Sequence, residues 1–219
     1  MQSTVPSRAP MLSGELTAGD KPAFDGRRQA KRRAERCAIV GDTFRHFLRR
    51  FMFSISQATH ASKAAQYDDL LQQARALIAD ETDFIANAAN FSSLVYHSLP
   101  DLNWAGFYRF DGTELVVGPF QGKPACVRIA LGRGVCGTAA RERRTQVVPD
   151  VHAFPGHIAC DSASRSEIVV PLVASDGTLI GVWDVDSPVP NRFDDEDALG
   201  MEALCTAFVA LAWGKQTER

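Results

Sequence analysis

The stretch EIVVPLVASDGTLIGVWDVDS, residues 167–187, decides the fold of this chain. It contains two apolar runs, EIVVPLVA and TLIGVWDVDS, and the dipeptide Asp176-Gly177 lies between them. An Asp-Gly pair between runs rich in β-branched residues is a strong short-range signal for a β-hairpin, because both residues tolerate the positive φ that a tight turn requires. The stretch therefore predicts two antiparallel strands of one sheet.

The length of this turn sets which residues of the hairpin lie opposite each other. If Asp176 and Gly177 form a two-residue loop, Glu167 lies opposite Asp186 and Val169 lies opposite Asp184. Alternate side chains of a strand point to the same face. One face of the hairpin then carries three carboxylates and three further residues of the second strand: Glu167, Asp184 and Asp186, with Thr178, Ile180 and Val182.

This concentration of carboxylates does not stabilise the predicted sheet. Opposed like charges destabilise a sheet, and neither strand carries a Lys or Arg that could neutralise them. One interpretation places the patch at the solvated end of the hairpin, where the high dielectric weakens the repulsion. The functional interpretations are a cation site, capture of a ligand ammonium group, or a carboxylic acid that its neighbours keep protonated.

On either side of the hairpin, the pattern of residues 67–219 predicts one α+β domain. Apolar residues at helical spacing predict helices near residues 67–78, 84–95 and 194–211. A second hairpin is expected around Asp111-Gly112, with further strands at CVRIA, which Cys126 begins, and at TQVVPDV. A short helix is expected over Gly134 to Glu142. Helices before and after a mostly antiparallel central sheet form an α+β layer design.

Residues 1–66 differ from this domain in composition and charge. They hold 12 basic and 5 acidic side chains, whereas the remainder holds 12 and 21, and residues 1–26 are rich in Pro, Gly, Ser and Thr. We expect a basic extension of low order. A solvated tail is the favoured interpretation, and a mitochondrial transit peptide and a nucleic-acid arm are the alternatives. We expect a cytoplasmic protein, or a mitochondrial one if the extension is a transit peptide.

The overall composition excludes several classes of protein. The chain has 219 residues, 45% of them hydrophobic and 23% charged, which is ordinary for a globular protein with one good core. It has no window of about 18 uninterrupted apolar residues, as a membrane span requires, and no apolar secretory signal near its start. We therefore expect a soluble, unsecreted protein with neither a membrane nor a nucleic acid as its partner.

The five cysteines are too few, and odd in number, for a disulfide scaffold in a chain without a secretory signal. Cys160 lies in the polar loop AFPGHIACDSAS and is expected to be exposed, whereas Cys205 falls on the apolar face of the last helix and is expected to be buried. Zinc could recruit His152, His157 and Cys160, but their spacing matches no closed structural site. We expect no resident metal.

Five motifs follow one another between Tyr67 and Trp213: NWAGFYRF, LVVGPFQGKPACVRI, GVCGTA, VVPDVHAFPGHIACDSASRSEIVVPL and GVWDVDSP. Together they resemble the free methionine-R-sulfoxide reductase family, whose members are single GAF domains. The cysteine-containing loop followed by SRSEIVVP is specific to that family among GAF proteins. Residues 1–66 lie outside the resemblance.

For the cysteines, the resemblance implies reduction of free methionine-R-sulfoxide by thiols. Cys160 would be the attacking cysteine, Cys126 the main resolving cysteine and Cys136 a third that can also form a disulfide. Attack by Cys160 would release methionine and leave a sulfenic acid, which a second thiol converts to a disulfide. An external dithiol such as thioredoxin would reduce that disulfide, so the chain needs no metal, flavin or nicotinamide.

For the substrate pocket, the resemblance implies that Glu167, Asp184 and Asp186 bind the substrate. Glu167 and Asp186 are also candidates for the acid that gives a proton to the departing oxygen. Trp104 and Tyr108 match aromatic residues around the substrate methyl group. They share a face of the first hairpin by parity, which a place in the sheet core would explain equally well.

A rival function from another class is a GAF sensor that binds a small molecule and catalyses nothing. The fold does not reject it, because one scaffold hosts both uses. A binding module, however, has no need of three cysteines together with three clustered carboxylates. A homodimer is left open, as is the relative use of Cys126 and Cys136.

Overall fold

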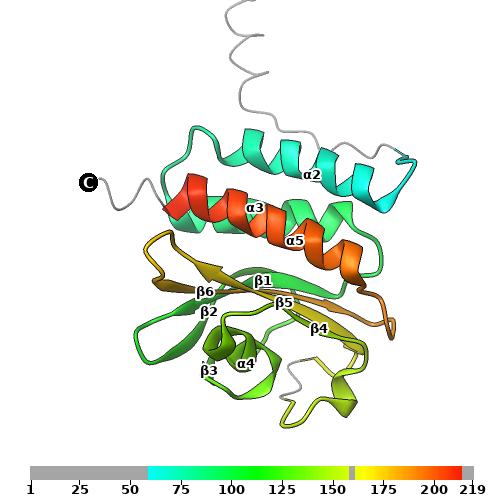
Figure 1. Ribbon diagram of the computed structural model, residues 1–219, viewed down its shortest axis with the longest axis vertical. Coiled ribbons are helices and arrows are strands. Elements are labelled where there is room, and N and C mark those ends of the chain that lie inside the picture. The colour runs from blue at the N-terminus through cyan, green and yellow to red at the C-terminus, as the bar shows by residue number, and fades with distance from the viewer. Residues whose placement is uncertain (1–58, 158–160, 214–219) are drawn as a thin grey trace, which may run out of the picture. The chain divides into compact units, whose positions relative to one another are not determined.

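The computed structural model describes residues 59–157 and 161–213, which form a six-stranded antiparallel sheet with helices on both faces (Figure 1). The strand order is β3-β2-β1-β6-β5-β4, so β1 and β6 pair at the centre. The strands are β1 (Trp104–Phe110), β2 (Glu114–Gly122), β3 (Arg128–Ala130), β4 (Gln146–Val148), β5 (Ser166–Val173) and β6 (Leu179–Ser187). The expected α+β class with a mostly antiparallel central sheet is confirmed.

The helices divide between the two sides of the sheet. Helices α2 (Lys63–Ile78), α3 (Phe84–Ser98) and α5 (Asp195–Phe208) lie on one side, and α4 (Gly134–Glu142) lies on the other (Figure 1). A 3₁₀ turn, η1 (Val151–Ala153), follows β4, and a π-helical turn, η2 (Val209–Trp213), continues α5. None of the helices described is long and apolar enough to span a membrane.

Polar side chains explain where the three helices of the larger layer begin. Ser62, Asp83 and Asp194 each accept a hydrogen bond from a backbone N–H in the first turn of α2, α3 and α5, respectively. Helix α2 begins at Lys63, before the apolar periodicity that starts at Tyr67. The expected division of the chain at residue 66 therefore falls inside this helix.

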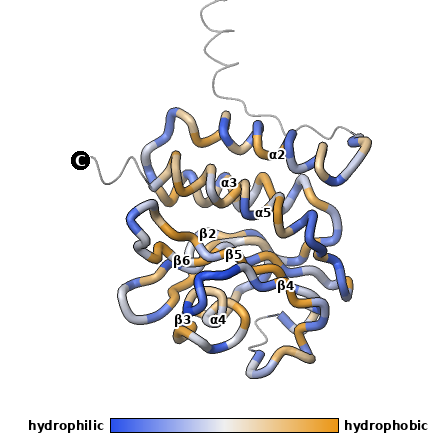
Figure 2. Tube along the Cα trace, in the orientation of Figure 1, coloured by the Kyte–Doolittle hydropathy of each residue, from blue (hydrophilic) through white to orange (hydrophobic). Residues whose placement is uncertain are grey.

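An apolar core fills the space between this helix layer and the sheet. Figure 2 shows apolar and polar residues alternating along α2, α3 and α5, which leaves each helix one apolar side for the core. The Phe107 ring centroid lies 4.7 Å from the centroids of Trp183 on β6 and Phe208 on α5. Phe91 of α3 packs edge-on against Trp183 at 4.9 Å. These aromatic contacts hold the helix layer to the central strands.

The hairpin formed by β5 and β6 has the register that the sequence predicts over most of its length. Glu167 pairs with Asp186 and Val169 pairs with Asp184. The turn itself differs from the prediction, because Ala174 N–H donates to the Thr178 carbonyl at 2.9 Å and leaves three residues in the loop.

An irregularity near the turn restores the predicted register. The pairing shifts by one residue between Leu172 and Val173, so that Leu172 pairs with Gly181 and Val173 with Leu179. Ile180 consequently packs in the core under the helix layer, whereas Val182 packs on the α4 side. The prediction that Ile180 and Val182 share a face is wrong, because it assumed a regular ladder down to a two-residue turn.

Candidate active site

The side of the sheet that α4 covers carries the three carboxylates of the hairpin. Glu167, Asp184 and Asp186 are only 6%, 6% and 9% exposed. The same strand β6 sends Trp183 and Val185 into the apolar core on the other side. Because the carboxylates are buried, the interpretation that they lie at a solvated strand end is wrong.

These carboxylates are buried without a Lys or Arg partner among the described residues. None of the Lys or Arg side chains in the described ranges forms an ion pair with them, and one oxygen of Asp184, Oδ1, is buried with no hydrogen-bond partner. Burial, reinforced by the charges of Asp184 and Asp186, raises the pKa of Glu167 well above its usual value. Burial likewise raises the pKa of Asp184 to about 7 and that of Asp186 well above its usual range. The cluster therefore retains protons in the absence of a ligand.

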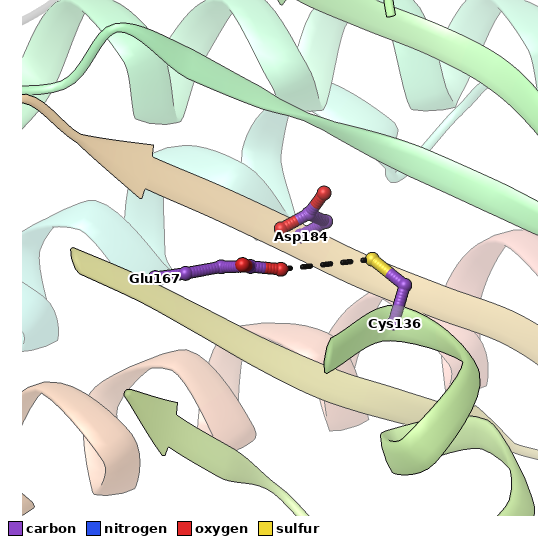
Figure 3. Close-up of side chains that lie close together, drawn as sticks. All are labelled: Cys136, Glu167 and Asp184. Carbon is purple, nitrogen blue, oxygen red and sulfur yellow. Dashed lines mark hydrogen bonds between the residues drawn. The ribbon is translucent and has the colours of Figure 1, made fainter. Parts of the chain in front are cut away.

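The first turn of α4 brings Cys136 to this cluster. The thiol donates to Glu167 Oε1 with 3.9 Å between sulfur and oxygen, and Figure 3 shows the two side chains pointing toward each other beside Asp184. Burial, followed by the charges of Asp184 and Glu167, raises the pKa of the Cys136 thiol. A Cβ at position 137 would lie 2.3 Å from the Ala130 carbonyl oxygen, so Gly137 lets the helix approach β3 this closely.

Strand β1 borders the cluster on its other edge. Trp104 pairs with Asp186 and Gly106 pairs with Asp184. The ring of Trp104 stacks on Tyr108 with 5.8 Å between centroids, so the prediction that the two aromatic residues share a face is confirmed. A Cβ at Gly106 would lie 2.7 Å from the Trp104 ring, so only glycine lets the indole lie across this position. Both aromatic residues are buried in the apolar cluster that also contains Cys136.

A cavity of about 20 Å³ lies between α4, the carboxylates and the loop that follows η1. Its lining includes Arg133, directly before α4, and three residues of this loop, His157, Asp161 and Ser164, none of which the sequence prediction assigned to the site. His157 Nε2 lies 4.0 Å from Glu167 Oε2, and burial lowers the pKa of His157. The only signal in the sequence for the three loop residues is that they lie near Cys160.

A polar network holds Asp161 at the edge of the cavity. Its carboxylate accepts hydrogen bonds from Lys123 at 3.2 Å and from Asn103 at 3.3 Å. The backbone N–H of Ala163 donates to the same carboxylate at 2.9 Å and lowers the pKa of Asp161. Asn103 also donates to Ser164 at 3.0 Å. Unlike the three carboxylates in the sheet, Asp161 is therefore held in its charged form by partners within the protein.

The cysteines occupy different environments. Cys126 is half-buried in the loop after β2 and does not line the cavity, and β3 begins two residues later, at Arg128, rather than at Cys126. The expectation that Cys205 is buried on α5 is confirmed, and burial raises the pKa of its thiol. Cys160, the expected nucleophile, lies outside the described residues. The roles of Cys160, Cys126 and Cys136 stay predictions.

Comparisons with known proteins agree with this geometry. The GAF domain family matches residues 34–213. The free methionine-R-sulfoxide reductase of Escherichia coli (strain K12) is 55% identical over 143 residues, which cover 65% of this chain and 86% of that protein. Its counterpart from Neisseria meningitidis, solved in complex with its substrate, is 44% identical with a TM-score of 0.72, and the match covers 77% of this chain and 100% of that one.

A third relative is described by a different function. A solved protein from Burkholderia vietnamiensis, described as a GAF sensor protein, is 78% identical with a TM-score of 0.70, and the match covers 72% of this chain and 99% of that one. The two reductases match most of their own length, and the resemblance seen in the sequence motifs is confirmed. This chain belongs to the free methionine-R-sulfoxide reductase family of GAF-domain proteins.

Proposed function

We propose that this protein reduces free methionine-R-sulfoxide to methionine. The observation that carries the proposal is the buried cluster of Glu167, Asp184 and Asp186, which has no Lys or Arg partner among the described residues. A buried carboxylate without a cation is costly unless a ligand supplies one or a proton is retained. The two relatives named free methionine-R-sulfoxide reductase support the same activity.

The cluster suits the α-ammonium group of a free amino acid. An ammonium has three N–H donors and one positive charge, so it can satisfy two carboxylates at once. We assign Asp184, whose Oδ1 has no hydrogen-bond partner among the described residues, to substrate binding. Trp104 and Tyr108 are assigned to the surroundings of the methyl group, because they stack on the same side of the sheet as Asp184 and Asp186.

The chemical step needs a thiolate and a proton. The thiolate of Cys160 attacks the sulfoxide sulfur, and Glu167 or Asp186, whose pKa values are raised by burial, donates a proton to the departing oxygen. The protonated oxygen passes from the substrate sulfur to the Cys160 sulfur, so that methionine leaves and Cys160 becomes the sulfenic acid in a two-electron reduction of the substrate. The retained proton thus polarises the S=O bond at the moment of attack.

A second thiol closes the cycle. Cys126 attacks the sulfenic acid of Cys160, forms a disulfide and releases water, and thioredoxin reduces this disulfide by exchange. The environment of Cys136 favours Cys126 for this step, because burial raises the pKa of the Cys136 thiol and thereby disfavours its reactive thiolate form.

The nucleophile is tested by Cys160→Ser. We expect this variant to release no methionine in a single turnover, whereas Cys205→Ser, which changes a buried thiol in the other layer, remains active. Substantial methionine release by Cys160→Ser would contradict the assignment.

The resolving thiol is tested by Cys126→Ser. We expect about one methionine per enzyme and poor turnover with thioredoxin, because the sulfenic acid lacks its partner. Peptide mapping of the oxidised wild-type protein should find Cys126 joined to Cys160. A bond between Cys136 and Cys160 alone would transfer the resolving role to Cys136.

A non-catalytic sensor would bind methionine sulfoxide without consuming thiols. Adding the free R-sulfoxide to the reduced protein therefore separates the two functions, since only the reductase loses free thiols. The S epimer and peptide-bound sulfoxide are the matched controls, and both should leave the thiols unchanged. A protein that binds the R-sulfoxide and keeps all of its thiols would be a sensor.

A further inference from the structure

Three side chains around the cavity form a set of ligand atoms that the reduction does not use together. One atom each from Cys136, Glu167 and Asp184 lies within 4.8 Å of the other two. They come from α4, β5 and β6, and Figure 3 shows the Cys136 sulfur and the Glu167 carboxylate pointing toward each other with Asp184 beside them. The set contains one thiol and two carboxylates.

The spacing of these atoms is close to that of a metal site. A tetrahedral Zn²⁺ binds thiolate sulfur at about 2.3 Å and carboxylate oxygen at about 2.1 Å, which places the two ligand atoms about 3.6 Å apart. Cys136 Sγ and Glu167 Oε1 are 3.9 Å apart. This pair needs a movement of a few tenths of an ångström to reach coordination distance, and the set as a whole, whose atoms lie within 4.8 Å of one another, closes with a movement of up to about 1 Å.

A second observation points independently to a missing ligand. Asp184 is 6% exposed, and its Oδ1 has no hydrogen-bond partner among the described residues. The adjoining cavity of about 20 Å³ exceeds the roughly 10–15 Å³ that a single water requires. The site therefore has both an unsatisfied oxygen and the space for one small ligand.

The chemistry of the donors selects the kind of ion. A cysteine sulfur, which releases its proton when it binds a metal, favours a borderline or soft cation over Mg²⁺ or Ca²⁺, which take oxygen ligands. His157 offers a further nitrogen donor, because its Nε2 lies 4.0 Å from the second oxygen of Glu167. One sulfur, two oxygens and one imidazole nitrogen or water would complete a tetrahedral set.

We propose that Cys136, Glu167 and Asp184 bind one Zn²⁺ ion, which inhibits the protein by occupying the carboxylates meant for the substrate. The inhibition rests on the proposed function, whereas the binding does not. Zinc and the substrate ammonium compete for the same oxygens, so each lowers the apparent affinity of the other. The ion acts as an inhibitor and takes no part in the reduction.

Binding is tested first, without activity. Calorimetric titration of the reduced full-length chain with ZnCl₂ should give one site per chain, and Cys136→Ser and Asp184→Asn should each weaken it at least tenfold. Cys205→Ser is the matched control and should bind as the wild type does. Cobalt in place of zinc should give a thiolate-to-metal absorption band that Cys136→Ser removes. Circular dichroism confirms that each near-isosteric variant is folded.

Variants of the other cysteines test whether the ion binds at this site. Zinc binding that survives Cys136→Ser but is lost in Cys160→Ser or Cys126→Ser would place the ion elsewhere, and absence of binding to the folded wild type would end the proposal. Cys160→Ser should still bind zinc, because its sulfur is not one of the three ligands.

Inhibition is tested in a single turnover without added dithiol, because a dithiol would itself bind zinc. We expect zinc to suppress methionine release at least tenfold, excess methionine sulfoxide to relieve the suppression, and EDTA to reverse it. If the protein binds zinc but has no reductase activity, the metal site is supported and the proposed function is refuted. Undiminished methionine release by a zinc-loaded protein would refute the inhibition alone.

Discussion

Two buried aspartates on opposite sides of the sheet show two ways to bury a carboxylate. Asp197, in the first turn of α5, accepts hydrogen bonds from Tyr67 at 2.8 Å, Lys63 at 2.8 Å and Arg192 at 3.3 Å. Asp184, on β6, has an oxygen with no partner among the described residues, and its neighbours are further carboxylates and a thiol. The helix layer therefore supplies Lys63 and Arg192 to Asp197, whereas none of the described Lys or Arg side chains pairs with Asp184.

The difference separates a structural carboxylate from a functional one. A buried ion pair stabilises a fold only when its hydrogen bonds are complete, as they are around Asp197. An uncompensated carboxylate costs free energy and persists where a ligand is meant to satisfy it. The two sites should therefore respond in opposite ways when the carboxylate is removed.

The largest expected effect comes from Asp197→Ala. Lys63 and Arg192 would lose their shared partner, and Arg192 is only 12% exposed. Breaking a buried pair costs about 3–5 kcal/mol, so the free energy of unfolding should fall by that order in urea denaturation. Asp184→Asn is the control, and it should leave the free energy of unfolding unchanged or increase it. Equal losses in both variants would erase the distinction between the two aspartates.

The next effect lies on the catalytic side of the comparison. Glu167→Gln and Asp186→Asn keep a hydrogen-bond donor but cannot deliver a proton, so each should slow the first turnover by more than roughly tenfold. Asp184→Asn should instead weaken substrate binding. Single-turnover methionine release measured against pH separates the three variants. Unchanged rates in both Glu167→Gln and Asp186→Asn would exclude the cluster from the chemistry.

The predicted pairing of these carboxylates is correct, although the predicted length of the turn is not. The hairpin has a three-residue loop rather than two, and the shift between Leu172 and Val173 compensates for that difference further along the strands. Strand alternation then placed Asp184 and Asp186 on one face. Their burial could not be predicted, because it depends on α4 packing from a distant part of the chain.

Two kinds of contact could not be predicted from the sequence: those made by residues in loops, and those between residues far apart in the chain. His157 and Asp161 lie in a loop, where no periodicity reveals the direction of a side chain. Lys63 falls within the predicted basic extension, although it pairs with Asp197, 134 residues further along the chain. Such contacts are properties of the tertiary fold and leave no local pattern.

A smaller effect concerns pH and follows from the proton that the Asp184 carboxyl retains. Burial raises the pKa of Asp184 to about 7 in the folded protein, against about 4 in an unfolded chain. Between these values the folded state holds more protons than the unfolded state. The free energy of unfolding should therefore fall as pH rises from 5 to 7, with a contribution from Asp184 of about 1 kcal/mol per pH unit.

The measurement is the difference between the wild type and Asp184→Asn over this pH range. His157 opposes the trend, because its lowered pKa makes stability rise with pH, but it is present in both proteins. Asp111 and Asp194, whose pKa values are lowered to about 2, change charge only below this range. The charge of Asp184 also raises the pKa values of Glu167 and Asp186, so the difference reports the coupled cluster. A wild-type stability that does not fall relative to Asp184→Asn would show that Asp184 adds no retained proton to the cluster in the substrate-free protein.

The smallest expected effect comes from shortening the N-terminus, and it tests both sides of the comparison at once. Removing residues 1–58 should change neither the free energy of unfolding nor the first turnover, because described residues between Tyr67 and Ala212 already build two buried clusters and the carboxylate site. Removing residues 1–66 also deletes Ser62, which caps α2, and Lys63, which pairs with Asp197. Loss of a cap alone lowers the free energy of unfolding by about 0.5–2 kcal/mol, so the shorter chain should be less stable but equally active when folded. Urea denaturation and single-turnover assays of the two truncated chains check both statements. A loss of first turnover in the stable, folded 59–219 chain would mean that the extension contributes to the site.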